Sequence, residues 1–143
     1  MSNDEEKGNS IISKDKKREF KQVSENERLL AMFIYITGLL IWILGPIIIW
    51  LLKREESEYI DYHGKEGLNF VISYTAYFAV LSIFFILSSF FSIVPLIGWI
   101  PMFFIGIIFP VVAVVFVVFV IVAAIKAYNN ELYKIPFIFR FIN

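Results

Sequence analysis

The chain has 143 residues, of which 59% are hydrophobic and 18% are charged, and its 13 basic and 13 acidic residues cancel at pH 7. A soluble domain has about 45–50% apolar and about 25% charged residues, so this chain carries more apolar surface than one small core can bury. The composition excludes a soluble enzyme and a disordered protein, and the lack of cysteine excludes a secreted disulfide scaffold, which leaves an integral membrane protein.

Residues 1–24 differ from the rest, because basic and acidic residues alternate there with almost nothing apolar. We expect a charged, mobile cytoplasmic tail, and its balanced charge argues against a nucleic-acid partner, which would need clustered positive charge. The remaining residues 25–143 form the expected helical membrane domain. Ser24 and Glu27 have the spacing of a capping box, which predicts a helix beginning near Glu25.

The first apolar segment, Leu29–Leu52, is long enough as one helix to cross a hydrocarbon core of about 30 Å. Gly45 and Pro46 interrupt it, because proline removes a backbone donor and clashes with the preceding turn. The segment is either one kinked span, which gives three spans in all, or a hairpin of two short helices broken between Gly38 and Pro46. The hairpin is favoured because it places all 13 basic residues on one side of the membrane, whereas a single crossing divides them almost evenly.

A polar connector follows at residues 55–67, where Ser57 is suited to cap an interfacial helix before the second span. Two apolar segments without any charged residue extend over residues 68–91 and 102–125. The predicted fold is therefore an all-α integral membrane protein, a small bundle with two full spans plus a broken or hairpin-like first segment. The distribution of basic residues favours a multi-pass protein of the plasma membrane with both termini in the cytoplasm.

The densest polar cluster borders the second span and consists of Asp61, His63, Gly64, Lys65, Glu66, Asn69 and Ser73. Ionisable groups at a membrane border favour a proton, ion or headgroup site. The other interpretation is the ordinary start of an interfacial helix, with the Lys65 side chain reaching out to the membrane surface. His63 is expected in an exposed, acidic connector.

Catalysis and metal binding are not expected. The single histidine and the absence of cysteine leave too few ligands for a metal site. No nucleophile has a base to activate it, and there is no glycine-rich phosphate loop, so the sequence predicts neither an enzyme nor a cofactor.

A polar stripe continues from the cluster into the second span, where Glu66, Asn69, Ser73 and Tyr77 follow one another at helical spacing. Because an unpaired polar group is costly in hydrocarbon, the stripe should face protein or a wet cavity. Helix packing and a conduction path both remain open as explanations.

Other features concern the helix break and the membrane interface. Gly45 and Pro46 form either a simple bend or the open helix end of a small binding site. Trp99, in a turn rich in proline and glycine, and Pro136 and Arg140, in a short aromatic tail, are expected to be interfacial anchors. A strand or helix that binds a partner is the alternative for the tail.

Three segments carry a resemblance to a known family: LGPIIIWLLKRE at 44–55, IDYHGKEGLNF at 60–70 and YKIPFIFRFI at 133–142. They resemble a widespread prokaryotic membrane family, catalogued as a domain of unknown function and likened to the twenty-kilodalton membrane subunit of the chloroplast inner-envelope protein translocon. The resemblance implies an all-helical bundle and a role near a polypeptide path.

The sequence thus favours a non-enzymatic multi-pass membrane protein that is a subunit or assembly partner of a larger membrane complex, with a link to polypeptide transport implied by the resemblance. About three apolar segments are too few to enclose a pore, so self-association or another membrane protein is expected in addition to the lipid bilayer. A small ion, proton or solute pathway and a membrane-stress or peptide-immunity protein are the alternatives.

Overall fold

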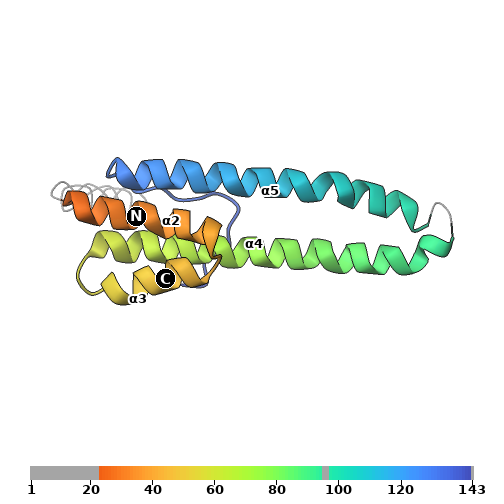
Figure 1. Cartoon of the computed structure of the whole chain (residues 1–143), viewed down its shortest axis with the longest axis horizontal. Coiled ribbons are helices and arrows are strands. Elements are labelled where there is room, and N and C mark those ends of the chain that lie inside the picture. Colours follow the sequence, from red (N-terminus) through yellow and green to blue (C-terminus); the bar gives the residue numbers. More distant parts are fainter. Residues whose placement is uncertain (1–22, 95–96, 143) are drawn as a thin grey trace, which may run out of the picture.

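The computed structural model describes residues 23–94 and 97–142, and over these ranges the chain is helical without any strand (Figure 1). The expected all-α fold is confirmed. Most of the expected N-terminal tail lies outside the described residues. The elements within the described residues are the α-helices α2 (Glu25–Leu40), α3 (Leu44–Lys53), α4 (Glu58–Phe90) and α5 (Trp99–Tyr128), and the short 3₁₀ helix η2 (Phe91–Ile93).

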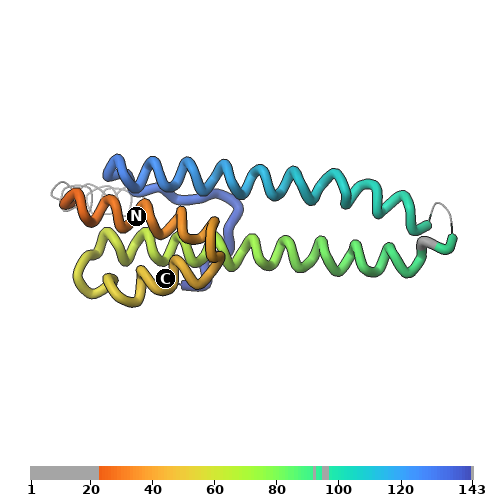
Figure 2. The backbone as a smooth tube through the Cα atoms, viewed as in Figure 1, coloured from red at the N-terminus to blue at the C-terminus, as the bar shows by residue number. Residues whose placement is uncertain are grey.

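Two hairpins of unequal length make up the fold. Helices α4 and α5 are antiparallel, and both are long and apolar enough to cross a membrane. The shorter α2–α3 hairpin packs against only one end of this pair, and the chain after α5 folds back over the same end (Figures 1 and 2). We call this the charged end, because the Asp, Glu, Lys and Arg residues of the described ranges lie there, at positions 25–66 and 126–140. The described residues between positions 67 and 125 carry no charge.

The predicted helix caps are confirmed. The Ser24 hydroxyl accepts the Glu27 backbone N–H, and the Glu27 carboxylate accepts the Ser24 backbone N–H in return, which completes the capping box of α2. The Ser57 hydroxyl caps α4 by accepting the Ile60 backbone N–H.

The expected connector at residues 55–67 is wrong beyond Ser57. Helix α4 begins at Glu58 and runs without interruption to Phe90, so the interfacial helix and the second span are one element. The helix continues through Gly64. The lack of a side chain at this position lets the Trp50 ring of α3 lie against α4, since a Cβ there would lie only 2.7 Å from Trp50 Cγ.

The first apolar segment is a hairpin. Helix α2 ends at Leu40, the chain reverses over residues 41–43, and α3 begins at Leu44. Trp42 at the reversal has a left-handed backbone with φ of 54°, which is strained for a residue other than glycine. Its indole N–H donates to the Thr75 hydroxyl of α4 at 2.8 Å, and this contact holds the turn against the long helix.

The reversal lies within the range between Gly38 and Pro46 that the hairpin prediction gives for the break, just before Gly45 and Pro46 themselves. Gly45 and Pro46 occupy the first turn of α3, where a missing backbone N–H costs little because the first N–H groups of a helix lack helical partners. Gly45 allows α2 and α3 to pack closely, because a Cβ at this position would lie 2.7 Å from the Thr37 carbonyl oxygen of α2.

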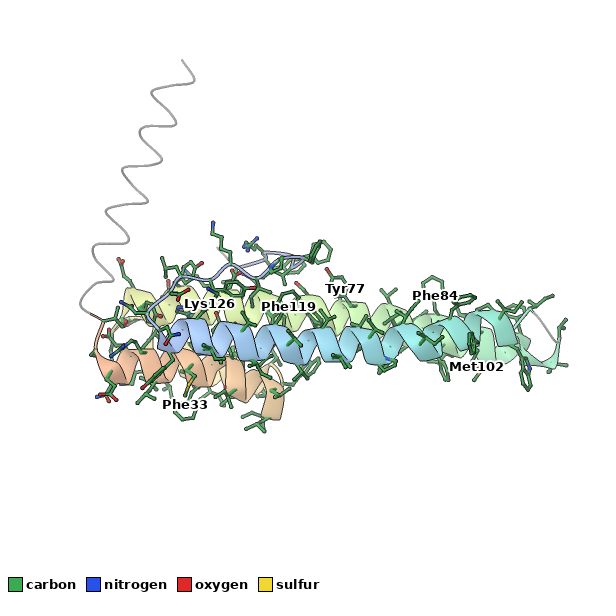
Figure 3. The ribbon with its side chains drawn as sticks, turned by 90° about the horizontal axis from the view of Figure 1, so that it is seen from above. Phe33, Tyr77, Phe84, Met102, Phe119 and Lys126 are labelled. Carbon is green, nitrogen blue, oxygen red and sulfur yellow. The ribbon has the colours of Figure 1, made fainter. Side chains whose placement is uncertain are left out.

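The core also sits at the charged end. The rings of Phe70 on α4 and Phe116 on α5 are stacked with their centroids 4.9 Å apart, and the small residues Ala31 and Ala123 let α2 and α5 approach closely. Beyond the α2–α3 hairpin, the two long helices continue alone. Figure 3 shows Phe84 and Met102 in this uncovered half and Lys126 at the other end.

The close approach at Gly45 generates a stability prediction. Gly45→Ala should lower the free energy of unfolding by about 1–3 kcal/mol, because the added methyl group overlaps Thr37. Thermal unfolding in detergent measures this. Gly106→Ala is the matched control: no atom lies within 4 Å of a Cβ there, and alanine is about 1 kcal/mol better than glycine in a helix. Equal losses for the two variants would contradict the close packing of α2 and α3.

Candidate functional site: the polar stripe of α4 and the C-terminal segment

The polar stripe of α4 holds the backbone of the C-terminal segment, residues 135–142. Among the side chains of the stripe, Asn69 makes the most hydrogen bonds to this segment. Its Oδ1 atom accepts the backbone N–H groups of Phe141 at 2.8 Å and Ile142 at 2.9 Å, and its Nδ2 atom donates to the Ile142 carbonyl at 2.8 Å. One buried amide side chain therefore satisfies three backbone groups of a segment that forms no helix or strand.

Ser73 and Tyr77 continue the same pattern along the helix. The Ser73 hydroxyl accepts the Phe139 backbone N–H at 2.8 Å, and the Tyr77 hydroxyl donates to the Phe137 carbonyl at 2.7 Å. Phe137 has a left-handed backbone with φ of 59°, at the turn where the segment starts along the stripe. The register between segment and helix is thus fixed at several points.

Glu66 supplies the one buried negative charge of the site. It is only 5% exposed, accepts the Ile135 backbone N–H at 2.7 Å and forms an ion pair with Arg140 at 3.0 Å. A buried carboxylate is tolerated when it is both paired and hydrogen-bonded, and both conditions are met. Arg140 also donates to the Ile135 carbonyl at 3.4 Å, which closes the segment on itself.

The stripe therefore faces protein, and its partner is the chain's own backbone rather than another helix. Arg140, predicted to reach headgroups, instead pairs with Glu66, with about two fifths of its side chain still exposed. Pro136 is exposed where the segment turns, and Phe137, Phe139 and Phe141 form an exposed aromatic row. Trp99 is exposed at the start of α5, at the opposite end of the molecule, so the three expected anchors do not form one group.

His63 was expected in an exposed connector, and that expectation is wrong. The side chain is 0% exposed, because α2 covers this turn of α4. Its Nδ1 atom lies 2.9 Å from the Tyr35 hydroxyl, and the Tyr59 ring packs against it with centroids 4.5 Å apart. Nε2 makes no hydrogen bond within the described residues. His63 is a packed core residue that ties α4 to α2.

Asp61 and Lys65 form the outer part of the predicted cluster. They make an ion pair of 2.7 Å one helical turn apart, and Asp61 also accepts the Trp50 indole N–H at 2.8 Å. Gly64 lies between them under the Trp50 ring. This side of α4 binds α3, whereas the side with Glu66 binds the C-terminal segment. The predicted residues therefore do not converge on one site.

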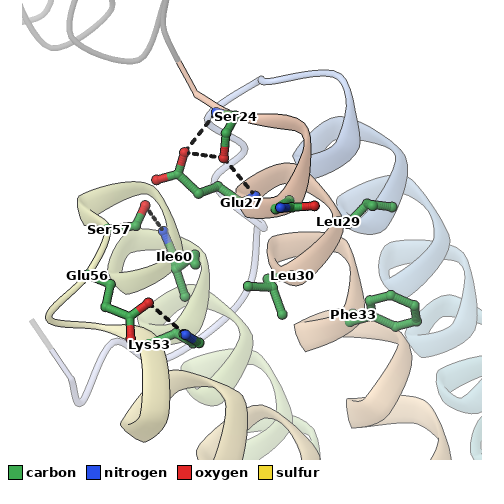
Figure 4. Close-up of a pocket in the computed structure, with 10 residues that line it drawn as sticks. Ser24, Glu27, Leu29, Leu30, Phe33, Lys53, Glu56, Ser57 and Ile60 are labelled. Atoms are coloured by element: carbon green, nitrogen blue, oxygen red, sulfur yellow. Dashed lines mark hydrogen bonds and ion pairs between the residues drawn. The ribbon is translucent and has the colours of Figure 1, made fainter.

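A cavity of about 560 Å³ lies where the first turns of α2 and α4 meet the end of α3 (Figure 4). Lys53 and Glu56 form an ion pair of 2.7 Å at its wall. Hydrogen bonds from the Ser57 hydroxyl and the Ser24 backbone N–H hold the pKa of Glu27 below its usual value. Leucine and phenylalanine side chains of α2 complete the lining.

Metal binding has no candidate within residues 23–94 and 97–142, where no group of three His, Asp or Glu side chains could hold an ion.

The sequence did not predict the partners of the candidate site residues, namely Tyr35, Trp50 and the backbone of the C-terminal segment. One signal was available: Glu66 is the last charged residue of its span and has no lysine or arginine one turn away, so a distant Arg140 was a reasonable partner.

Two comparisons with known proteins give the family of the chain. The family model described as the magnetosome magnetite crystal formation protein family matches residues 26–142, which include both hairpins and the C-terminal segment. A relative from Archaeoglobus fulgidus, a UPF0132 membrane protein, is 31% identical over 103 residues, which cover 71% of this chain and 84% of the relative. No solved structure matches. These findings confirm a prokaryotic membrane family and lend no support to the likeness to the translocon subunit.

The bonds of Asn69 generate a prediction about the C-terminal segment. Asn69→Leu keeps the side-chain size but leaves three backbone groups without partners, which should cost about 1–3 kcal/mol. We expect the amides of Phe141 and Ile142 to exchange hydrogen faster and the segment to be trimmed faster by carboxypeptidase. Ser89→Ala, on the same helix but far from the segment, should change neither rate. Unchanged exchange in Asn69→Leu would contradict the role of the stripe.

Proposed function

Because the chain belongs to the magnetosome magnetite crystal formation protein family, we propose that it is a non-enzymatic, multi-pass membrane protein that acts as a subunit or assembly partner of a larger membrane complex. The relative named a membrane protein and the two long apolar helices support the membrane part of this proposal. The family description refers to magnetite crystal formation, and our proposal for this chain concerns membrane assembly alone.

One observation carries the assembly role. In the half of the α4–α5 pair that α2 and α3 do not cover, an apolar groove of about 420 Å³ opens between the two helices. Gly106 lies in it, with no atom within 4 Å of the position a Cβ would take. Small residues at an open groove let another helix approach closely, and such packing is one of the contributions that drive helix association in lipid. The lining residues are Ser82, Phe85, Ile86, Ile105, Gly106, Phe109 and Pro110.

The ion or proton pathway has weaker support. It was based on Glu66 and Asn69, and both side chains are occupied by the C-terminal segment. A conducting route along the stripe would first require this segment to leave. A membrane-stress or peptide-immunity role has no specific observation in its favour. A link to polypeptide transport stays a prediction from the sequence motifs.

The orientation follows from charge. The basic residues of the described ranges lie in the elements of the charged end, whereas η2 and the start of α5 carry none. Basic residues next to membrane spans favour the cytoplasmic side. We therefore place the charged end, and with it both termini, on the cytoplasmic side of the plasma membrane.

The groove at Gly106 provides the test of assembly. Gly106→Phe should fill the groove and reduce association with a second copy or another subunit, while leaving the packed charged end intact. Mass measurement and crosslinking after extraction in mild detergent report the assembly state. Val114→Phe adds the same ring to an exposed position of α5 outside the groove and is the matched control. If Gly106→Phe and the unaltered chain form identical assemblies, the groove is not the contact surface.

A further inference from the structure

The two ends of the molecule differ in cross-section. At the charged end, α2, α3, α4 and α5 lie together, with the C-terminal segment against them. At the other end, only α4 and α5 remain (Figure 2). Since each helix with its side chains is about 10 Å wide, the charged end occupies roughly twice the area of the other end.

The α2–α3 hairpin belongs in hydrocarbon rather than in water. No charged residue occurs between Leu29 and Leu52. The side chains that point away from the protein are large and apolar, including Leu40 at 73% exposed and Leu44 at 62% exposed. Exposing such surface to water would cost about 25 cal/mol for each Å². Lipid is therefore the solvent that these faces fit.

The hairpin does not reach through the membrane. Its tip is level with Thr75, because Trp42 at the reversal donates to the Thr75 hydroxyl. Glu66 is the last charged residue of α4 before the uncharged stretch. The distance along the helix from Glu66 to Thr75 is about 14 Å at about 1.5 Å per residue. This is about half of a hydrocarbon core of about 30 Å, so the hairpin occupies one leaflet.

We propose that the chain is a membrane wedge that concentrates in bilayers whose convex surface is on the side of its charged end. The ligand is a curved lipid surface, since in a bent bilayer the convex leaflet has more area to accommodate the wider end. Helices inserted into one leaflet are known to respond to curvature in this way. The inference rests on the membrane insertion in the proposed function. In the proposed orientation, the favoured membranes bulge toward the cytoplasm.

The test measures curvature sorting separately for each orientation. The chain has no cysteine, so Glu55→Cys, in the exposed loop between α3 and α4, allows a single dye at the charged end. The labelled full chain is reconstituted into giant vesicles of phosphatidylcholine, and a narrow tube is pulled outward. Dye density in the tube, relative to a lipid dye, is compared with that in the vesicle wall. An impermeant quencher added outside then abolishes the fluorescence of dyes on the outer face, so that the remaining signal comes from molecules whose charged end faces the lumen.

The two orientations should sort in opposite directions. Molecules with the charged end outside should be enriched in the tube, with a density ratio above one that rises as the tube narrows. Molecules with the charged end inside should be depleted, with a ratio below one. The same ratio for both orientations, or the reverse order, would overturn the wedge. If the chain can be washed from the vesicles with alkaline carbonate, the proposed membrane insertion itself fails, whereas insertion without sorting contradicts the wedge alone.

Discussion

Backbone hydrogen bonding in a medium without water is the constraint on which this structure depends. In hydrocarbon, each N–H and C=O group that leaves a helix must find a partner within the protein. The chain leaves helical structure at two critical places, the reversal between α2 and α3 and the C-terminal segment. The first is kept to three residues and is held by the Trp42 indole, and the second lies along the polar side chains of α4.

The same constraint explains why one end is wide and the other narrow. The non-helical C-terminal segment needs the polar stripe, which lies in the first half of α4, so the segment lies at that end. The short hairpin is bound to the same half through Trp42 and Tyr35. The other half of the pair consists of helix alone, apart from Pro110 within α5, and no other element of the described residues covers it. It is left with apolar faces and the open groove at Gly106. The proposed wedge and the proposed assembly surface thus both depend on this one arrangement.

Local features could be predicted from the sequence and long-range contacts could not. Ser24 and Ser57 were identified as caps because capping depends on residues within one turn. His63 was misplaced because its burial depends on α2, whose Tyr35 lies 28 residues earlier in the chain and contacts the histidine only after folding. The stripe was recognised, but its partner was not, since Asn69 binds backbone groups that every residue possesses.

The central claim is that the α2–α3 hairpin enters and leaves the membrane on the same side. Cysteine accessibility tests this claim most directly. Glu25, Glu55 and Ile97 are exposed in the structure, so each can be replaced by a single cysteine that a reagent can reach. The chain has no native cysteine that would compete for the label. Labelling of sealed, oriented membrane vesicles with an impermeant maleimide should modify positions 25 and 55 from the same face and position 97 from the other. Labelling of positions 25 and 55 from opposite faces would show that the first apolar segment crosses the bilayer, and it would contradict the account.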